Sequence, residues 1–145
     1  MDLPEEKIIR PELLKVLCIL TFIGSGISFF SYFVLVFTLD FFRTIETGEM
    51  FGFFQSEEEQ NMLSMIFSLP KIYFIIHSVL YAASLYGAYL MWNLRKTGFH
   101  FYAIAQISLL IVYKAFIPEV PFPFIPLIIT VVFILLYYSN LRFMR

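Results

Sequence analysis

Residues 16–39 read VLCILTFIGSGISFFSYFVLVFTL, and no residue of this run carries a formal charge. A bilayer core about 30 Å thick is crossed by about 20 helical residues, so the run is long enough to span a membrane. Signal-peptide cores are shorter, at about 7–15 residues, so we expect a retained first span rather than a cleaved signal. The run therefore predicts a membrane-spanning helix near the start of the chain.

Three further apolar runs follow along the chain, at residues 72–94, 99–117 and 120–141, and Lys114 is their one residue with a formal charge. Helices are favoured over barrel strands because helices satisfy every backbone group internally, and because apolar residues such as Leu127 and Ile128 are adjacent rather than alternating. The sequence thus predicts one all-α domain over residues 1–145. It is an integral membrane bundle of four transmembrane helices, at about residues 13–39, 71–94, 99–117 and 121–141.

The composition excludes most soluble classes. Of the 145 residues, 60% are hydrophobic and only 14% are charged, whereas about 25% are charged in ordinary soluble domains. The formal net charge of −1 provides no basic surface, so we expect no nucleic-acid partner. The single Cys18 excludes a disulfide framework and a thiolate zinc site.

Lysine and arginine near the ends of the predicted spans set the orientation, because cytoplasmic loops are enriched in them. One side holds both termini and the second loop, with basic residues Lys7, Arg10, Lys15, Arg95, Lys96, Arg142 and Arg145. The opposite side holds only Arg43, Lys71 and Lys114. We therefore expect both termini to be cytoplasmic and the glutamate-rich first loop to lie outside.

The first outer loop, residues 40–70, contains Ser56 followed by three glutamates. A serine three residues before a glutamate is typical of a capping box, which predicts a short helix that begins near Glu57. We expect this helix at the outer membrane interface, with Pro70 breaking the chain before the second span. A plain interfacial linker is the simpler interpretation, and a partner-docking surface is the alternative.

Small residues indicate where the helices pack, because helices in lipid associate through close contacts and polar groups. Pairs spaced four apart occur at Gly24 and Ser28 in the first span, and at Ala83 and Gly87 in the second. Gln106, an amide inside the third span, is expected to hydrogen-bond between helices. The fourth span has almost no small residues, so we expect it to pack more loosely.

Two ionisable residues share a depth in the outer third of the predicted bundle. At 1.5 Å per residue, Lys114 lies about 22 Å from the inner edge and His77 about 9 Å below the outer edge. Tyr32 and Thr130 lie at similar levels, and ionisable residues inside membranes often mark function. These four residues form the candidate ligand or partner site. In the competing interpretation, Lys114 extends to the surface to meet an acid, Asp40 or Glu119, and His77 only bonds a neighbouring helix.

Known membrane chemistries do not fit this inventory. His77 and His100 lie at opposite ends of the predicted bundle, so one haem cannot use both. A carboxylate in the middle of a span is absent, as is a cluster of His, Asp and Glu with metal spacing. The sequence therefore predicts no catalytic site, no cofactor and no metal.

Two stretches resemble a known group of proteins. RP at residues 10–11 with VLCILTFIGSG at residues 16–26 resembles the first helix of small uncharacterised four-helix inner-membrane proteins of Bacteroidota. GAYLMWNLRKTG at residues 87–98 is similar to their second helix and turn. The resemblance implies four spans in a bacterial inner membrane, and it supplies no activity and no site residues.

These observations lead to two functional expectations. The first is a non-enzymatic accessory or scaffold subunit of a larger membrane complex, because the aromatic-rich surface exceeds what four helices can bury among themselves. The second is a small transporter, channel, or lipid- or small-ligand-binding protein that uses the outer-third polar residues. Membrane lipid is an expected partner in both, together with protein partners or further copies of the chain.

Overall fold

The computed structural model describes residues 10–44 and 56–145, and the regular secondary structure in these ranges is all helical. Lys7 and residues 45–55 of the first loop lie outside the described residues. In chain order the elements are α1 (Glu12–Thr44), α3 (Glu57–Ser68), α4 (Lys71–Trp92), α5 (Thr97–Phe116), α6 (Phe124–Asn140) and the 3-10 turn η1 (Leu141–Phe143).

Four of these helices are long and apolar enough to cross a membrane: α1, α4, α5, and α6 with its extension to Phe143. The predicted all-α bundle is therefore confirmed as a fold class. α1 continues beyond the expected residue 39 to Thr44. α6 begins only at Phe124, because Pro121 and Pro123 lack the backbone N–H that a helix needs in its interior.

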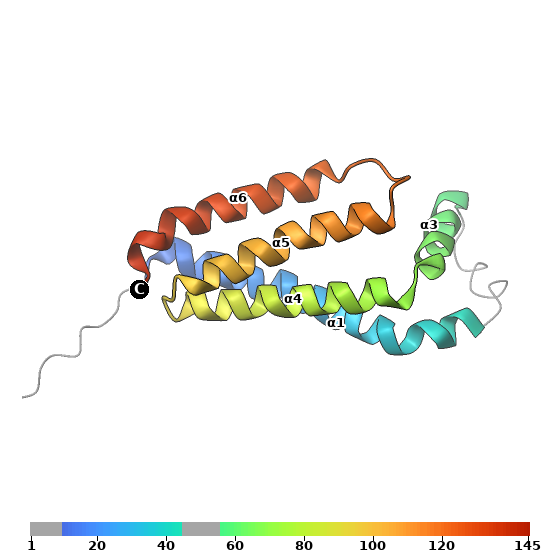
Figure 1. Cartoon of the computed structure of the whole chain (residues 1–145), viewed down its shortest axis with the longest axis horizontal. Helices are drawn as coiled ribbons and strands as arrows, with labels where there is room; N and C mark the ends of the chain where they lie inside the picture. Colours follow the sequence, from blue (N-terminus) through green and yellow to red (C-terminus); the bar gives the residue numbers. More distant parts are fainter. Residues whose placement is uncertain (1–9, 45–55) are drawn as a thin grey trace, which may run out of the picture.

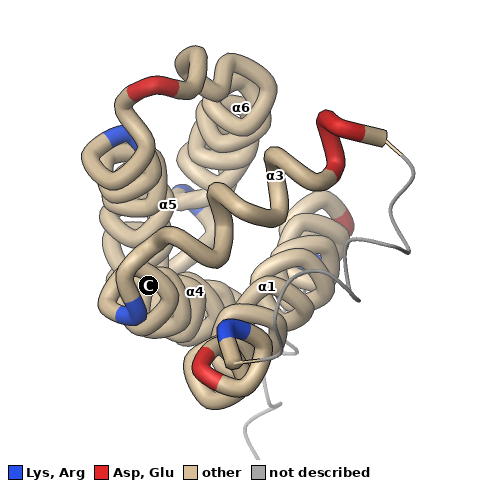
Figure 2. The backbone as a smooth tube through the Cα atoms, turned by 90° about the vertical axis from the view of Figure 1, so that its right-hand side faces the viewer, with Lys and Arg blue, Asp and Glu red and all other residues tan. Residues whose placement is uncertain are grey.

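The four long helices surround a common axis, and α4 is the central element of one side (Figures 1 and 2). α1 and α5 pack closely along α4 from either side, so that the three form a curved layer. α6 covers this layer and contacts both α1 and α5 less extensively. This looser packing agrees with the shortage of small residues in the fourth span.

Close approach of α4 and α5 depends on a glycine. A Cβ added to Gly87 would lie 2.7 Å from the backbone nitrogen of Tyr102 and 2.8 Å from the backbone oxygen of Gly98. Both are main-chain atoms that cannot rotate away. Gly87 therefore allows the two helix backbones to touch, as small residues commonly do between membrane helices.

Two apolar clusters lie at opposite ends of the bundle. The α3-end cluster consists of Leu39, Leu69, Tyr73, Phe74 and Ile117. The C-terminal cluster consists of Leu14, Leu17, Cys18, Met91, Leu94, Tyr102, Tyr137 and Met144. The first cluster joins α1 and α4 to the residues that follow α3 and α5, and the second joins α1, α4, α5 and α6, so apolar side chains pack at both ends of the bundle.

α3 begins as the capping pattern predicts. Ser56 is the N-cap residue, and its side chain accepts a hydrogen bond of 3.3 Å from the backbone nitrogen of Glu59. The helix lies across one end of the bundle (Figure 2) and has no fully buried residue of its own. Its attachment therefore depends on contacts at its C-terminal end.

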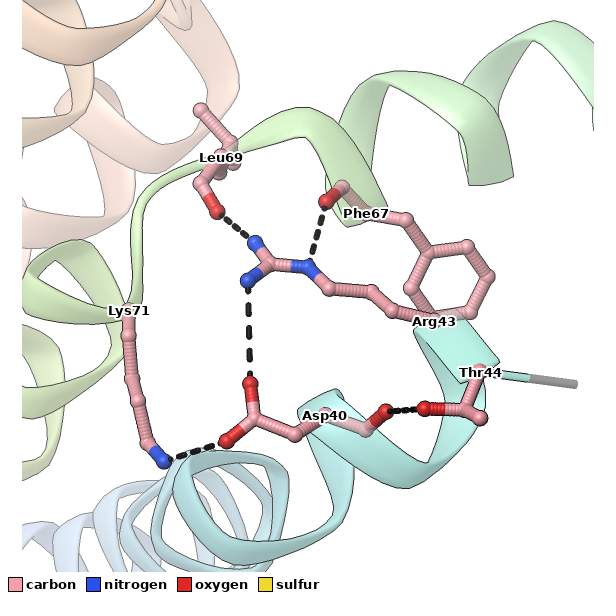
Figure 3. A network of polar contacts seen from close by, with 6 residues as sticks. All are labelled: Asp40, Arg43, Thr44, Phe67, Leu69 and Lys71. Carbon is pink, nitrogen blue, oxygen red and sulfur yellow. Dashed lines mark hydrogen bonds and ion pairs between the residues drawn. The ribbon is translucent and has the colours of Figure 1, made fainter.

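That attachment is a polar clamp made by the end of α1 (Figure 3). Arg43 donates from Nε to the carbonyl of Phe67 at 3.0 Å and from a terminal nitrogen to the carbonyl of Leu69 at 2.6 Å. Asp40 lies 3.8 Å from Arg43 and accepts a hydrogen bond of 2.8 Å from Lys71. The guanidinium satisfies carbonyls that the end of a helix leaves without intrahelical partners.

Candidate functional site

Two adjoining cavities of about 230 and 220 Å³ lie between α6 and the layer of α1, α4 and α5. Tyr81, Gln106 and Thr130 line both, and we call the two cavities together the chamber. The half nearer α3 is completed by Tyr32, His77, Leu109, Leu110, Tyr113, Pro123 and Pro126. The other half is completed by Leu20, Thr21, Gly24, Ser25, Ser28, Tyr102, Ile129 and Phe133.

A chain of hydrogen bonds crosses the layer beside the chamber. Gln106 of α5 donates from Nε2 to the Oγ of Ser84 on α4 at 3.0 Å, and Ser84 Oγ lies 3.1 Å from Ser25 Oγ on α1. Ser84 is fully buried. Because these bonds join three helices, they fix the polar wall of the chamber as well as the packing of the layer.

Stacked rings form the wall nearer α3. The ring of Tyr32 stacks on His77, at a centroid distance of 4.9 Å, and on Tyr81, at 5.6 Å, and the rings of His77 and Tyr81 are 6.4 Å apart. His77 is buried, and its Nδ1 lies 3.0 Å from the carbonyl oxygen of Tyr73. That carbonyl can only accept, so Nδ1 carries the proton, and the other nitrogen of the neutral imidazole is an acceptor.

The chamber is closed at the other end by a contact between α1 and α6. Thr21 Oγ1 and Tyr137 Oη are 2.8 Å apart, and both side chains are buried. The Tyr137 ring packs edge-on against Tyr102 of α5 at a centroid distance of 4.9 Å. This contact joins the loosely packed α6 to the layer and lies within the C-terminal cluster.

The structure brings together three of the four candidate site residues. Tyr32, His77 and Thr130 line the same half of the chamber. Lys114 does not join them, since its Nζ donates to the carbonyls of Pro118 at 2.8 Å and Val120 at 2.9 Å. α5 ends two residues after Lys114, so carbonyls of the connection to α6 lie within reach of the ammonium group.

Asp40, one of the two acids expected to meet Lys114, has other partners. Among the described residues, Asp40 forms its ion pairs with Arg43 and Lys71 instead. The C-terminal end of α1 and the start of α4 bring these three side chains together (Figure 3), whereas Lys114 lies on α5. Lys114 therefore lies apart from the other three residues, and its part in a ligand or partner site stays a prediction.

The residues that the sequence predicts to pack helices together lie in different surroundings. Gly87 lies at the α4–α5 contact, Gln106 bonds between helices, Ser28 lines the chamber and Ala83 is half-buried. A Cβ added to Gly24 would meet no atom of this chain within 4 Å, so the packing of a helix against Gly24 stays a prediction. The α1 face against α4 contains Ser25 instead, which lies about 100° further around the helix.

Several chamber residues were not singled out from the sequence, although a pattern marks them. Polar side chains recur every three or four residues along α1, at Thr21, Ser25, Ser28 and Tyr32, and along α4, at Tyr73, His77, Tyr81 and Ser84. Residues with this spacing share one helix face. In apolar helices, two polar stripes of this kind indicate faces that meet inside the bundle.

The chamber offers hydrogen bonds without formal charge. None of the described residues that line it is Asp, Glu, Lys or Arg. The described residues also contain no group of three His, Cys, Asp or Glu side chains arranged to hold a metal ion. The arrangement suits a neutral group that hydrogen-bonds to hydroxyls and an amide beside aromatic rings.

Fold and chamber together define an all-helical protein with four helices capable of spanning a membrane and an uncharged polar cavity among them. No family model, no curated protein and no solved structure matches the chain.

Proposed function

We propose that this chain is a multi-pass membrane protein that binds a neutral amphiphilic molecule in the chamber. The observation that carries the proposal is the lining, which combines hydroxyl, amide and imidazole groups with apolar side chains and contains no charged residue among those described.

The packing at the C-terminal end of the bundle supports binding rather than conduction. The apolar cluster there contains the fully buried side chains of Cys18, Met91 and Tyr137. The rim between α1 and α6 contains the exposed residues Leu20, Gly24 and Ile129. A molecule dissolved in the bilayer reaches the chamber through this rim, beside the loosely packed α6.

The sequence supports an orientation and a membrane for this protein. The basic residues at the ends of the spans support cytoplasmic termini, and α3 then lies on the outer face. The resemblance to Bacteroidota proteins supports a bacterial inner membrane. An accessory-subunit function stays a prediction, and its contact surface would include the exposed rings of Phe30, Phe37 and Phe41 on α1.

The test is binding of radiolabelled 1-monooleoylglycerol to the purified protein in maltoside micelles. We expect saturable binding that Thr130→Val weakens roughly fivefold, as the loss of one hydrogen bond predicts. Thr38→Val is the matched control, because Thr38 bonds the carbonyl of Val34 and does not line the chamber. Absence of saturable binding to the wild-type protein, or equal effects of both substitutions, would contradict the proposal.

A further inference from the structure

A third cavity, of about 400 Å³, lies beneath α3. α3 contributes Met62, Met65 and Ile66 to its wall, and Leu35, Phe74 and Ile117 come from α1, α4 and α5. The exposed start of α3 carries three glutamates, whereas this wall is almost entirely apolar. α3 therefore separates an apolar space from the surroundings of the bundle end.

This α3 cavity adjoins the chamber. Tyr32 and Tyr113 line both, so the two tyrosines form the boundary between an apolar space and a polar one. The residues lining the α3 cavity include no Asp, Glu, Lys or Arg among those described. Met65 and Ile66 also pack against the α3-end cluster, so the cavity is a gap within packed apolar surroundings.

The volume of the α3 cavity is compatible with an apolar chain. A cavity of about 150 Å³ holds one benzene ring, so about 400 Å³ has room for several methylenes of a hydrocarbon chain. Methionine side chains adapt well to a chain of variable shape. The chamber, with its hydroxyls and amide, matches the polar group at the end of such a chain.

We propose that the α3 cavity binds the hydrocarbon chain of the chamber's ligand, which makes that ligand a neutral single-chain amphiphile such as a monoacylglycerol or a long-chain alcohol. The inference rests on the proposed function, and it adds where the ligand's hydrocarbon chain lies and that the ligand has one such chain. The polar group lies beside Gln106 and Thr130, and the chain passes Tyr32 and Tyr113 to lie beneath α3. Fatty-acid and lysophospholipid anions bind less well, because no described lining residue neutralises their charge.

The experiment compares Met65→Trp with Ser64→Trp. Met65 lines the α3 cavity, whereas the neighbouring Ser64 is exposed and bonds the carbonyl of Asn61. We expect Met65→Trp to weaken binding of 1-monooleoylglycerol by about tenfold, because the indole occupies the space of several methylenes. Ser64→Trp should leave the affinity unchanged. Glycerol monohexanoate, with a chain too short to fill the α3 cavity, should bind both variants equally and show that Met65→Trp is folded.

A monooleoylglycerol analogue with a diazirine at the chain end locates the chain directly. Photolysis should label the peptide that contains Met62 to Ile66, and oleate should compete poorly. Labelling confined to α1 and α6 residues of the chamber rim, with no effect of Met65→Trp, would overturn this inference while leaving the proposed function intact. If neither probe binds the wild-type protein saturably, the proposed function itself fails.

Discussion

Lys114 shows how the backbone can satisfy a charged residue within an apolar helix. Its ammonium group donates to two carbonyls of the connection that follows α5, and its side chain is only half-buried. The aliphatic stem covers apolar surface while the charge lies near the helix end, which is the usual arrangement of lysine in membranes. Its surroundings therefore indicate a local structural contribution.

Replacing Lys114 by methionine should accordingly be tolerated. Pro118 is exposed and Val120 is half-buried, so water can replace the lost donor, and we expect a loss of about 1 kcal/mol or less. Thermal unfolding in detergent, followed by circular dichroism, measures it. Gln106→Leu is the positive control, since it removes the donor to the fully buried Ser84 and should cost about 1–3 kcal/mol. A loss for Lys114→Met as large as that of the control would show that its charge has a buried partner.

At the scale of elements, the tightest contact is between α4 and α5. The missing side chain of Gly87 lets the backbone of α4 approach Tyr102 and Gly98 of α5. α1 joins the same helix through hydroxyl contacts and through Cys18, whose Sγ lies 3.8 Å from the carbonyl of Ala88. α6 lacks a comparable close seam, so the chamber lies on its side of the bundle.

Gly87→Ala should separate α4 and α5. Its new Cβ would lie within 3 Å of two backbone atoms, so we expect a destabilisation of about 1–3 kcal/mol, typical of overpacking. Gly24→Ala is the matched control, because the space around Gly24 is open and alanine favours helix more than glycine does. Melting temperatures in detergent should fall for the first variant and stay level or rise for the second. Equal losses would place Gly24 in a contact with another molecule.

The sequence predicts where the helices lie along the chain better than it predicts which face of each helix points into the bundle. Long uncharged runs define the four spans, and the serine before three glutamates defines α3, because both are local signals. Gly24 was chosen over Ser25 as a packing residue because small size alone does not determine which face points inward. Likewise, the depth of Lys114 is a sum of helical rises, whereas its partners depend on the path of the chain after α5.

At the scale of the whole molecule, the proposed orientation in the membrane rests on the basic residues near the span ends. Single cysteines placed in a Cys18→Ser background test it, since serine fits the buried site of Cys18. We expect Glu58→Cys on α3 to react with an impermeant maleimide in intact cells, and Lys96→Cys only after permeabilisation. Both side chains are exposed, so a difference in maleimide labelling reports the side of the membrane on which each residue lies. The opposite pattern would reverse the proposed orientation.

The hydrogen bond between Thr21 and Tyr137 has a consequence for biogenesis. It joins the first long helix to the last, so the chamber has no fourth wall until α6 has left the insertion machinery and docked. Before α6 docks, Thr21 lacks its partner Tyr137, whereas Ser25 of α1 and Gln106 of α5 already have Ser84 of α4 as a partner. Docking of the last long helix therefore adds a hydrogen bond and the remaining wall to a three-helix layer that already holds its own polar contacts.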